Sequence, residues 1–150
     1  MKIVIGSDHR GVKLKSAITK FLSSKGHEVT DVGTYTEDSC DYPVYCVKAG
    51  EMVAAKTVDT GIFICYTGIG SSIALNKIKG VRASLVGNVK AAKLTRQHND
   101  SNMLVLGSAF LTQELALRIV SAYIKSEFEG GRHTKRVDMV NAIESGCKFC

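Results

Sequence analysis

Short apolar runs alternate with segments of helical periodicity along this chain of 150 residues. The apolar runs have the length of strands and are nearly continuous, as is typical of parallel strands covered on both faces. Strands that alternate with helices in this way form parallel sheets with right-handed crossovers. We expect five strands, at Lys2–Ser7, Glu28–Val32, Gly61–Cys65, Val81–Val86 and Met103–Leu106.

The helical segments complete this pattern, and the predicted fold class is α/β. Five strands favour the doubly wound order 2-1-3-4-5, in a single-domain, three-layer, Rossmann-like sandwich. We assign residues 1–145 to this domain and residues 146–150 to a C-terminal tail. Helices are expected at Val12–Lys25, Pro43–Thr57, Ser71–Ile78, Val89–Gln97, Thr112–Phe128 and Arg132–Glu144.

Charge and cysteine content narrow the class of partner. The excess of 20 Lys and Arg over 14 Asp and Glu gives a net charge of +6. The basic residues are scattered, which disfavours nucleic acid and leaves a phosphorylated metabolite or a merely solvated basic surface.

No apolar run reaches the length of a membrane span. Five irregularly spaced cysteines and no signal peptide predict a cytoplasmic protein, and Cys147 with Cys150 is only weak evidence for a metal or redox motif.

The chemistry is expected where the third strand ends. That strand runs into Cys65, Thr67 and a turn that contains Gly68 and Gly70. In an open parallel sheet, ligands bind at the carboxyl ends of the strands, and a following helix N-terminus favours anions. Such a field lowers the pKa of a thiol from its usual value of about 8.5. The alternative is that Cys65 is an inert core residue, because cysteine is often buried.

A second loop is expected at the same edge. Asp8 and His9 follow the first strand, which neighbours the third strand in the predicted order. A carboxylate, an imidazole and a thiol would therefore meet at one cleft, as in sites of acid–base chemistry. The alternatives are that Asp8 only caps the following helix and that His9 is a surface residue.

Two further polar clusters lie outside this cleft in the predicted topology. The segment Arg96–Asn102 leads into the fifth strand and so belongs to the opposite edge of the sheet. Arg132 and Arg136 are four residues apart and would share one helix face, which suits the oxygens of a phosphate. A solvated basic helix end is the alternative for this pair.

Six ordered motifs together resemble ribose-5-phosphate isomerase type B, within the sugar-phosphate isomerase family that includes galactose-6-phosphate isomerase. The resemblance extends from Met1 to about Glu144. It implies an aldose–ketose isomerase that interconverts ribose 5-phosphate and ribulose 5-phosphate with no metal and no other cofactor. It also implies a homodimer, or a tetramer built from dimers, with active sites at the subunit interface and the C-terminal helix reaching the partner. The motifs lie at residues 6–9, 33–35, 41–43, 65–70, 96–102 and 129–133.

The resemblance also implies roles for single residues. Cys65 is the base that moves a proton between C2 and C1, and His98 opens the sugar ring. Thr67 and the backbone amides of Tyr66, Gly68, Ile69 and Gly70 stabilise the oxyanion. Substrate contacts are implied for Asp8 and His9, for Asn99 at a hydroxyl group, and for Arg132 and Arg136 at the phosphate.

Two positions depart from the family pattern. Tyr66 stands where the family usually has glycine, and Ala109 follows Gly107-Ser108 where the family often has arginine. Both changes bear on which sugar is preferred. An isomerase of a six-carbon sugar phosphate, galactose or allose 6-phosphate, therefore stays open as an alternative. A non-catalytic module that binds phosphate or a nucleotide is a third hypothesis.

Overall fold

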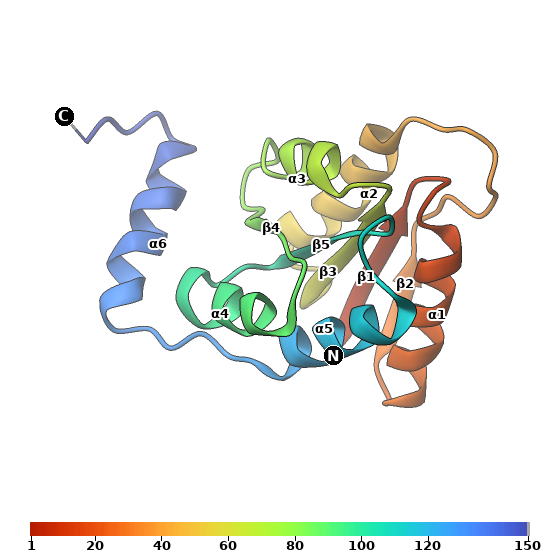
Figure 1. The fold of residues 1–150 in the computed structure, drawn as a ribbon. Helices are drawn as coiled ribbons and strands as arrows, with labels where there is room; N and C mark the ends of the chain where they lie inside the picture. Colours follow the sequence, from red (N-terminus) through yellow and green to blue (C-terminus); the bar gives the residue numbers. More distant parts are fainter. Residues whose placement is uncertain (150) are drawn as a thin grey trace.

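The computed structural model describes residues 1–149 and contains a five-stranded parallel sheet with helices on both faces (Figure 1). The strands are β1 (Lys2–Ser7), β2 (Glu28–Asp31), β3 (Thr60–Cys65), β4 (Ala83–Leu85) and β5 (Met103–Gly107). The helices are α1 (Val12–Ser24), α2 (Tyr42–Ala54), α3 (Ile69–Leu75), α4 (Val89–Asn99), α5 (Gln113–Lys125) and α6 (Arg132–Ile143). Every predicted element is present, with bounds shifted by a few residues. Cys150 lies outside the described residues, so the predicted tail is described only as far as residue 149.

The predicted strand order is wrong for the last two strands. The sheet runs β2-β1-β3-β5-β4, so β5 lies beside β3 and β4 is the edge strand. Burial explains the exchange: β5 is buried along its whole length and needs a neighbour on each side. β4 has only three residues and is at most half-buried, which suits a short edge strand.

The two faces of the sheet carry separate apolar cores. Alternate residues of β1, β3 and β5, such as Ile5, Ile64 and Leu106, pack against α1, α4 and α5. The residues between them, such as Phe63 and Cys65, pack against α2 and α3. The Cys65 side chain therefore belongs to the α2–α3 layer, at the end of the strand.

A buried lysine fixes the loop after β2. The Lys15 ammonium lies 2.6 Å from Asp31 Oδ1 and donates a hydrogen bond of 2.6 Å to the carbonyl of Thr34. It also lies 4.8 Å from the ring centroid of Tyr35. These contacts compensate for burying the charge and hold the start of the loop against α1.

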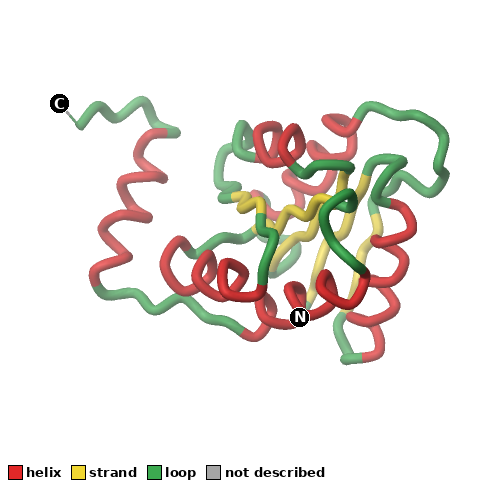
Figure 2. Tube along the Cα trace, in the orientation of Figure 1, coloured by secondary structure: helices red, strands yellow, loops and turns green. Residues whose placement is uncertain are grey.

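The C-terminal helix stands apart from the sheet. α6 contacts α4 and adds no residue to either of the two apolar cores. Figure 2 shows it as the separate red helix beyond the loop that follows α5. Several of its apolar side chains are exposed, among them Val140 and Ile143. Within residues 1–149, no helix has the length and apolar character needed to cross a membrane.

Candidate active site

The Cys65 thiol lies at the carboxyl end of β3, as predicted. The residue is 4% exposed, and the backbone N–H of Gly68 donates a hydrogen bond of 3.1 Å to its sulfur. A donor aimed at sulfur stabilises the thiolate more than the thiol. This hydrogen bond holds the sulfur against the turn that leads into α3.

Glycines allow the tight turn that follows Cys65. Gly68 has a φ of +79°, and a Cβ at this position would come within 2.3 Å of the Leu85 side chain. A Cβ at Gly107 would lie 2.5 Å from the carbonyl oxygen of Thr67. The Thr67 hydroxyl accepts the N–H of Ile69 at 3.3 Å. Because α3 begins at Ile69, earlier than predicted, Ile69 and its neighbour Gly70 belong to the first helical turn, where backbone N–H groups lack intrahelical partners.

The predicted meeting of the β1 and β3 loops is confirmed. The N–H of Asp8 donates to the carbonyl of Ile64 at 3.1 Å, one residue before Cys65. The Asp8 carboxylate is buried, and its Oδ1 accepts the N–H groups of Arg10 at 2.9 Å and Gly11 at 3.1 Å. Asp8 thus shapes the turn into α1, although the N-cap residue itself is Gly11.

His9 contacts the loop that precedes α2. The N–H of Cys40 donates to His9 Nδ1 at 3.3 Å. In the neutral imidazole an acceptor at Nδ1 places the proton on Nε2, so the other ring nitrogen is a donor. This hydrogen bond orients the ring without using the nitrogen that can donate to a ligand.

A second thiol lies in the same layer, but it is not suited to proton transfer. Cys46 is fully buried, and burial is the main cause that raises its pKa to about 12. Cys65 and Asp8 contribute smaller effects in the same direction. Cys46 therefore stays protonated near neutral pH.

A cavity of about 400 Å³ opens beside this turn. His9, Arg10, Tyr66 and Ala109 contribute to its lining. The Tyr66 side chain is 55% exposed, so it stands at the cavity instead of packing into the protein. The departure from glycine at residue 66 therefore changes the surface of the cavity and leaves the buried part of the turn intact.

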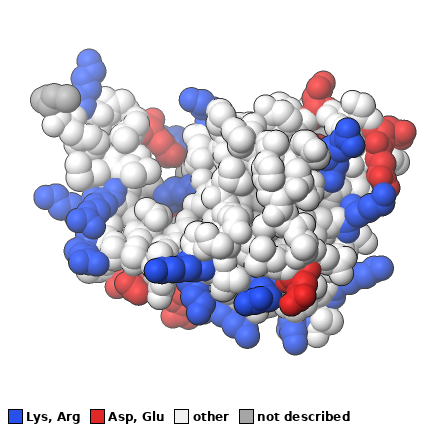
Figure 3. Space-filling model, viewed as in Figure 1, with Lys and Arg blue, Asp and Glu red and all other residues white. Residues whose placement is uncertain are grey.

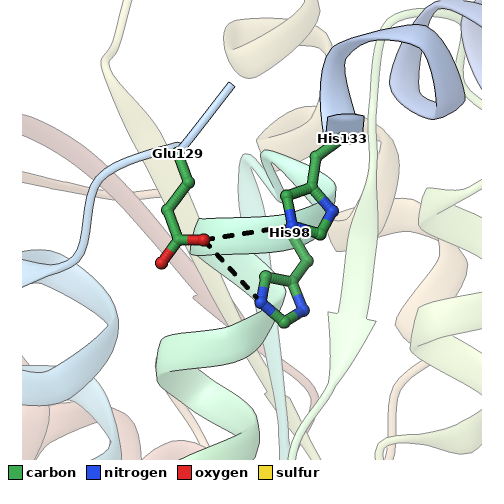
Figure 4. A group of neighbouring side chains, drawn as sticks. All are labelled: His98, Glu129 and His133. Atoms are coloured by element: carbon green, nitrogen blue, oxygen red, sulfur yellow. Dashed lines mark ion pairs between the residues drawn. The ribbon is translucent and has the colours of Figure 1, made fainter. Parts of the chain in front are cut away.

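A second group of polar side chains surrounds His98, near the end of α4. The rings of His98 and His133 stack with centroids 4.3 Å apart and planes 9° from parallel. Glu129 Oε2 lies 3.9 Å from the Nε2 atom of each ring (Figure 4). Gly130 and Gly131 both have positive φ, and the turn they form joins Glu129 to the first residues of α6. The proximity of Glu129 and His133 to His98 was not predicted from the sequence. The double glycine, which marks the turn before α6, was the available signal.

The other predicted residues of this group are exposed. Asn99 is the last residue of α4, and Arg136 lines a cavity of about 590 Å³ together with His98 and His133. Arg132 begins α6, and its Nε donates to His133 Nε2 at 3.5 Å. The predicted phosphate ligands thus lie near His98.

The same three side chains come close enough to be considered as metal ligands. One ligand atom from each of His98, Glu129 and His133 lies within 4.8 Å of the others. However, the lone pair of an imidazole nitrogen lies in the ring plane, and these two planes are nearly parallel. The two lone pairs therefore do not converge on one ion at the usual distance of about 2.0–2.1 Å. The arrangement of the two rings is therefore unfavourable for a metal centre.

We expect His133 to be neutral at pH 7. Its burial lowers its pKa below the ordinary value of 6.5, and His98 and the flanking arginines lower it further, while Glu129 raises it. The folded protein binds a proton at His133 less readily than the unfolded chain does. The contribution of this residue to the free energy of unfolding therefore falls as the pH decreases through 6.5 towards the lowered pKa. An NMR titration of the imidazole signals measures the midpoint directly. His98→Asn should raise the midpoint of His133 and Glu129→Gln should lower it, and a midpoint above 6.5 in the unaltered protein contradicts the assignment.

A single chain does not bring the two groups together. Tyr66 and His9 line one cavity, whereas His98, Asn99 and Arg136 line the other. This separation agrees with the prediction that the Arg96–Asn102 segment belongs to the opposite edge of the sheet from Cys65.

Known proteins resemble this chain in sequence and in fold. The family model described as Ribose/Galactose Isomerase matches residues 3–140. Ribose-5-phosphate isomerase B of Escherichia coli is 46% identical over 143 residues, which are 95% of this chain and 96% of that protein. A structure of ribose-5-phosphate isomerase B from Clostridium thermocellum has a TM-score of 0.96 at 47% identity, over 97% of this chain and 99% of that one. A Mycoplasma genitalium structure with bound ribulose-5-phosphate has a TM-score of 0.94 at 40% identity, over 97% of each chain. With the family model and near-complete coverage in agreement, the chain belongs to the ribose/galactose isomerase family.

Proposed function

We propose that this protein interconverts ribose 5-phosphate and ribulose 5-phosphate without a metal or another cofactor. The observation that carries the proposal is the buried Cys65 sulfur, which accepts the N–H of Gly68 at 3.1 Å beside the Asp8–His9 loop. Relatives named ribose-5-phosphate isomerase B, and the ribulose-5-phosphate bound to one of them, support this choice of substrate.

In the proposed reaction, Cys65 acts as the base. Its thiolate takes the proton from C2 of the open-chain aldose, and the electron pair forms the C1–C2 double bond of an enediolate. The thiol then returns the proton to C1, while a hydroxyl proton moves from O2 to O1, which leaves the ketose. Thr67 and the backbone amides at the start of α3 stabilise the negative oxygen, a contribution that is typically worth about 10²–10³ in turnover for one donor.

Ring opening requires a second proton-transfer group, and His98 fits this role. An imidazole can donate a proton to the ring oxygen from one nitrogen and accept one from the hydroxyl at C1. Stacking on His133 and the carboxylate of Glu129 orient the imidazole. We assign the substrate hydroxyl groups to Asp8, His9 and Asn99, and the phosphate to Arg132 and Arg136.

We propose further that the complete site forms between two copies of the chain. Within residues 1–149, His9 and Tyr66, which lies next to Cys65 in the chain, line one cavity, and His98 lines another. Ile69 and Ile73 on α3, and Val140 and Ile143 on α6, are exposed apolar residues. Figure 3 shows few charged side chains over the middle of the main body, whereas both acidic and basic side chains lie in the hollow between α6 and that body. A second copy that covers this face would carry its His98 towards Cys65 and reach across with α6.

The experiment is an assay of the purified protein with ribose 5-phosphate in the presence of EDTA. Formation of ribulose 5-phosphate at a rate unaffected by EDTA is the expected result. Galactose 6-phosphate and allose 6-phosphate are assayed in parallel. Faster turnover of either hexose phosphate would assign the six-carbon alternative, and loss of activity with EDTA would rule out the metal-free mechanism.

A further inference from the structure

We infer that Arg10 binds the phosphate group of the substrate and that the ring of Tyr66 holds its guanidinium in position. This inference rests on the proposed function, because it assigns the phosphate of that sugar to a particular cavity. It also explains why this chain carries a large aromatic residue directly after Cys65.

The two side chains are in contact at the mouth of the site. The Arg10 Cζ atom lies 5.5 Å from the centroid of the Tyr66 ring. This distance is within the range of about 6 Å in which a cation is attracted to an aromatic face. Both residues line the cavity of about 400 Å³ that also contains His9.

Backbone contacts join the segments that carry these side chains. The N–H of Ala109 donates to the carbonyl of Tyr66 at 2.9 Å, and the hydroxyl of Ser108 donates to the carbonyl of Arg10 at 3.1 Å. The end of β5 thus connects the loop of Arg10 to the turn of Cys65. The backbone segments that carry Arg10, Tyr66 and Cys65 are therefore joined to one another.

Arg10 supplies the uncompensated positive charge of this cavity. Lys13 also lines it but pairs with Glu37 at 3.0 Å, which neutralises both groups. The Asp8 carboxylate contacts the backbone N–H of Arg10, and no carboxylate pairs with the Arg10 guanidinium among residues 1–149. Ala109, which also lines the cavity, carries no charge.

A free guanidinium is suited to a phosphate monoester. Its planar set of donors matches two phosphate oxygens, and a group already positioned by a ring loses less freedom on binding. Tyr66 adjoins Cys65 in the chain, so a phosphate at Arg10 leaves the rest of the sugar beside the turn that holds the sulfur. Arg10 belongs to the subunit that provides Cys65, whereas Arg132 and Arg136 would approach from the other copy.

The test compares Arg10→Met with Lys20→Met, which removes one positive charge from an exposed residue of α1 that forms no ion pair within residues 1–149. For ribose 5-phosphate we expect Arg10→Met to raise KM by about tenfold or more and to change kcat by less than about threefold, because uniform binding is lost. Lys20→Met should change neither. An unchanged KM in Arg10→Met would overturn the inference.

Tyr66 is expected to act as a positioning residue. Tyr66→Phe keeps the aromatic face and should leave KM within about twofold, whereas Tyr66→Leu removes it and should raise KM by about threefold to tenfold. If Tyr66→Phe and Tyr66→Leu give the same KM, the ring has no role in holding Arg10.

A binding measurement separates this inference from the proposed function. Calorimetric titration with inorganic phosphate should show about tenfold weaker binding by Arg10→Met than by the unaltered protein, whether or not ribose 5-phosphate is converted. If the protein has no isomerase activity but shows this loss, the proposed function fails and the phosphate site stands. If phosphate binds both proteins equally, the site fails whatever the activity.

Discussion

Replacement of Cys65 by alanine will lower kcat for the isomerisation of ribose 5-phosphate by about 10²–10⁴-fold, the usual contribution of a positioned general base. KM will change by less than about threefold, because the sulfur acts on the transition state and the groups that bind the sugar remain. Steady-state kinetics on both the aldose and the ketose measure the effect. The sulfur lies at the end of β3, where it accepts the N–H of Gly68 at 3.1 Å, and this position is the reason for assigning it the role of base.

Cys46→Ala is the matched control for this experiment. It removes the neighbouring thiol, which is fully buried and has a pKa of about 12, and it should leave kcat unchanged. The stability of both variants is compared by urea unfolding, so that loss of fold is not mistaken for loss of chemistry. If Cys65→Ala retains more than about a tenth of the original kcat, Cys65 is not the base. The non-catalytic binding hypothesis predicts that Cys65→Ala keeps ligand binding and loses nothing measurable.

Mixing two inactive variants will restore activity if each site is built from two copies. Cys65→Ala and His98→Ala homodimers, mixed in equal amounts and allowed to exchange, yield about half heterodimers. Each heterodimer has one site with both residues intact and one with neither. The mixture should therefore reach about a quarter of the activity of the unaltered protein.

Two controls make the mixing experiment decisive. Native mass spectrometry with one isotopically labelled variant measures the exchange, and a mixture of Cys65→Ala with the double variant Cys65→Ala/His98→Ala should remain inactive. Complete exchange with no recovered activity would show that Cys65 and His98 do not act across the interface. Absence of any dimer would contradict the proposed assembly itself.

The fold could be predicted from the sequence because each element carries its own local pattern. The fully apolar run at Met103–Leu106 and the helical periodicity after Thr112 identify their elements without reference to the rest of the chain. The order of the last two strands could not be obtained in this way, because it depends on which strand is buried on both sides. The short β4, with an exposed leucine in three residues, was the available signal for an edge strand.

The site could be predicted where topology alone brings residues together. Asp8 and Cys65 follow neighbouring parallel strands, so their proximity required only the order of β1 and β3. The stacking of His133 on His98 depends instead on the path of the chain through Gly130 and Gly131, which a helical or strand pattern does not encode. The contact between Arg10 and Tyr66 likewise joins two exposed side chains, and no periodicity marks such a pair.

The close approach of Gly107 to the Thr67 carbonyl means that some positions of the cleft tolerate substitution and others do not. The backbone of the Cys65 turn is held by two positions, 68 and 107, where no side chain fits. The side chains of Tyr66 and Ala109 point outward and are exposed. Substitutions at residues 66 and 109 can therefore change the surface of the cleft without displacing the backbone of the turn. A mutant library directed at those two positions should yield folded variants with altered sugar selectivity, whereas side chains at positions 68 and 107 should displace the turn that holds the sulfur.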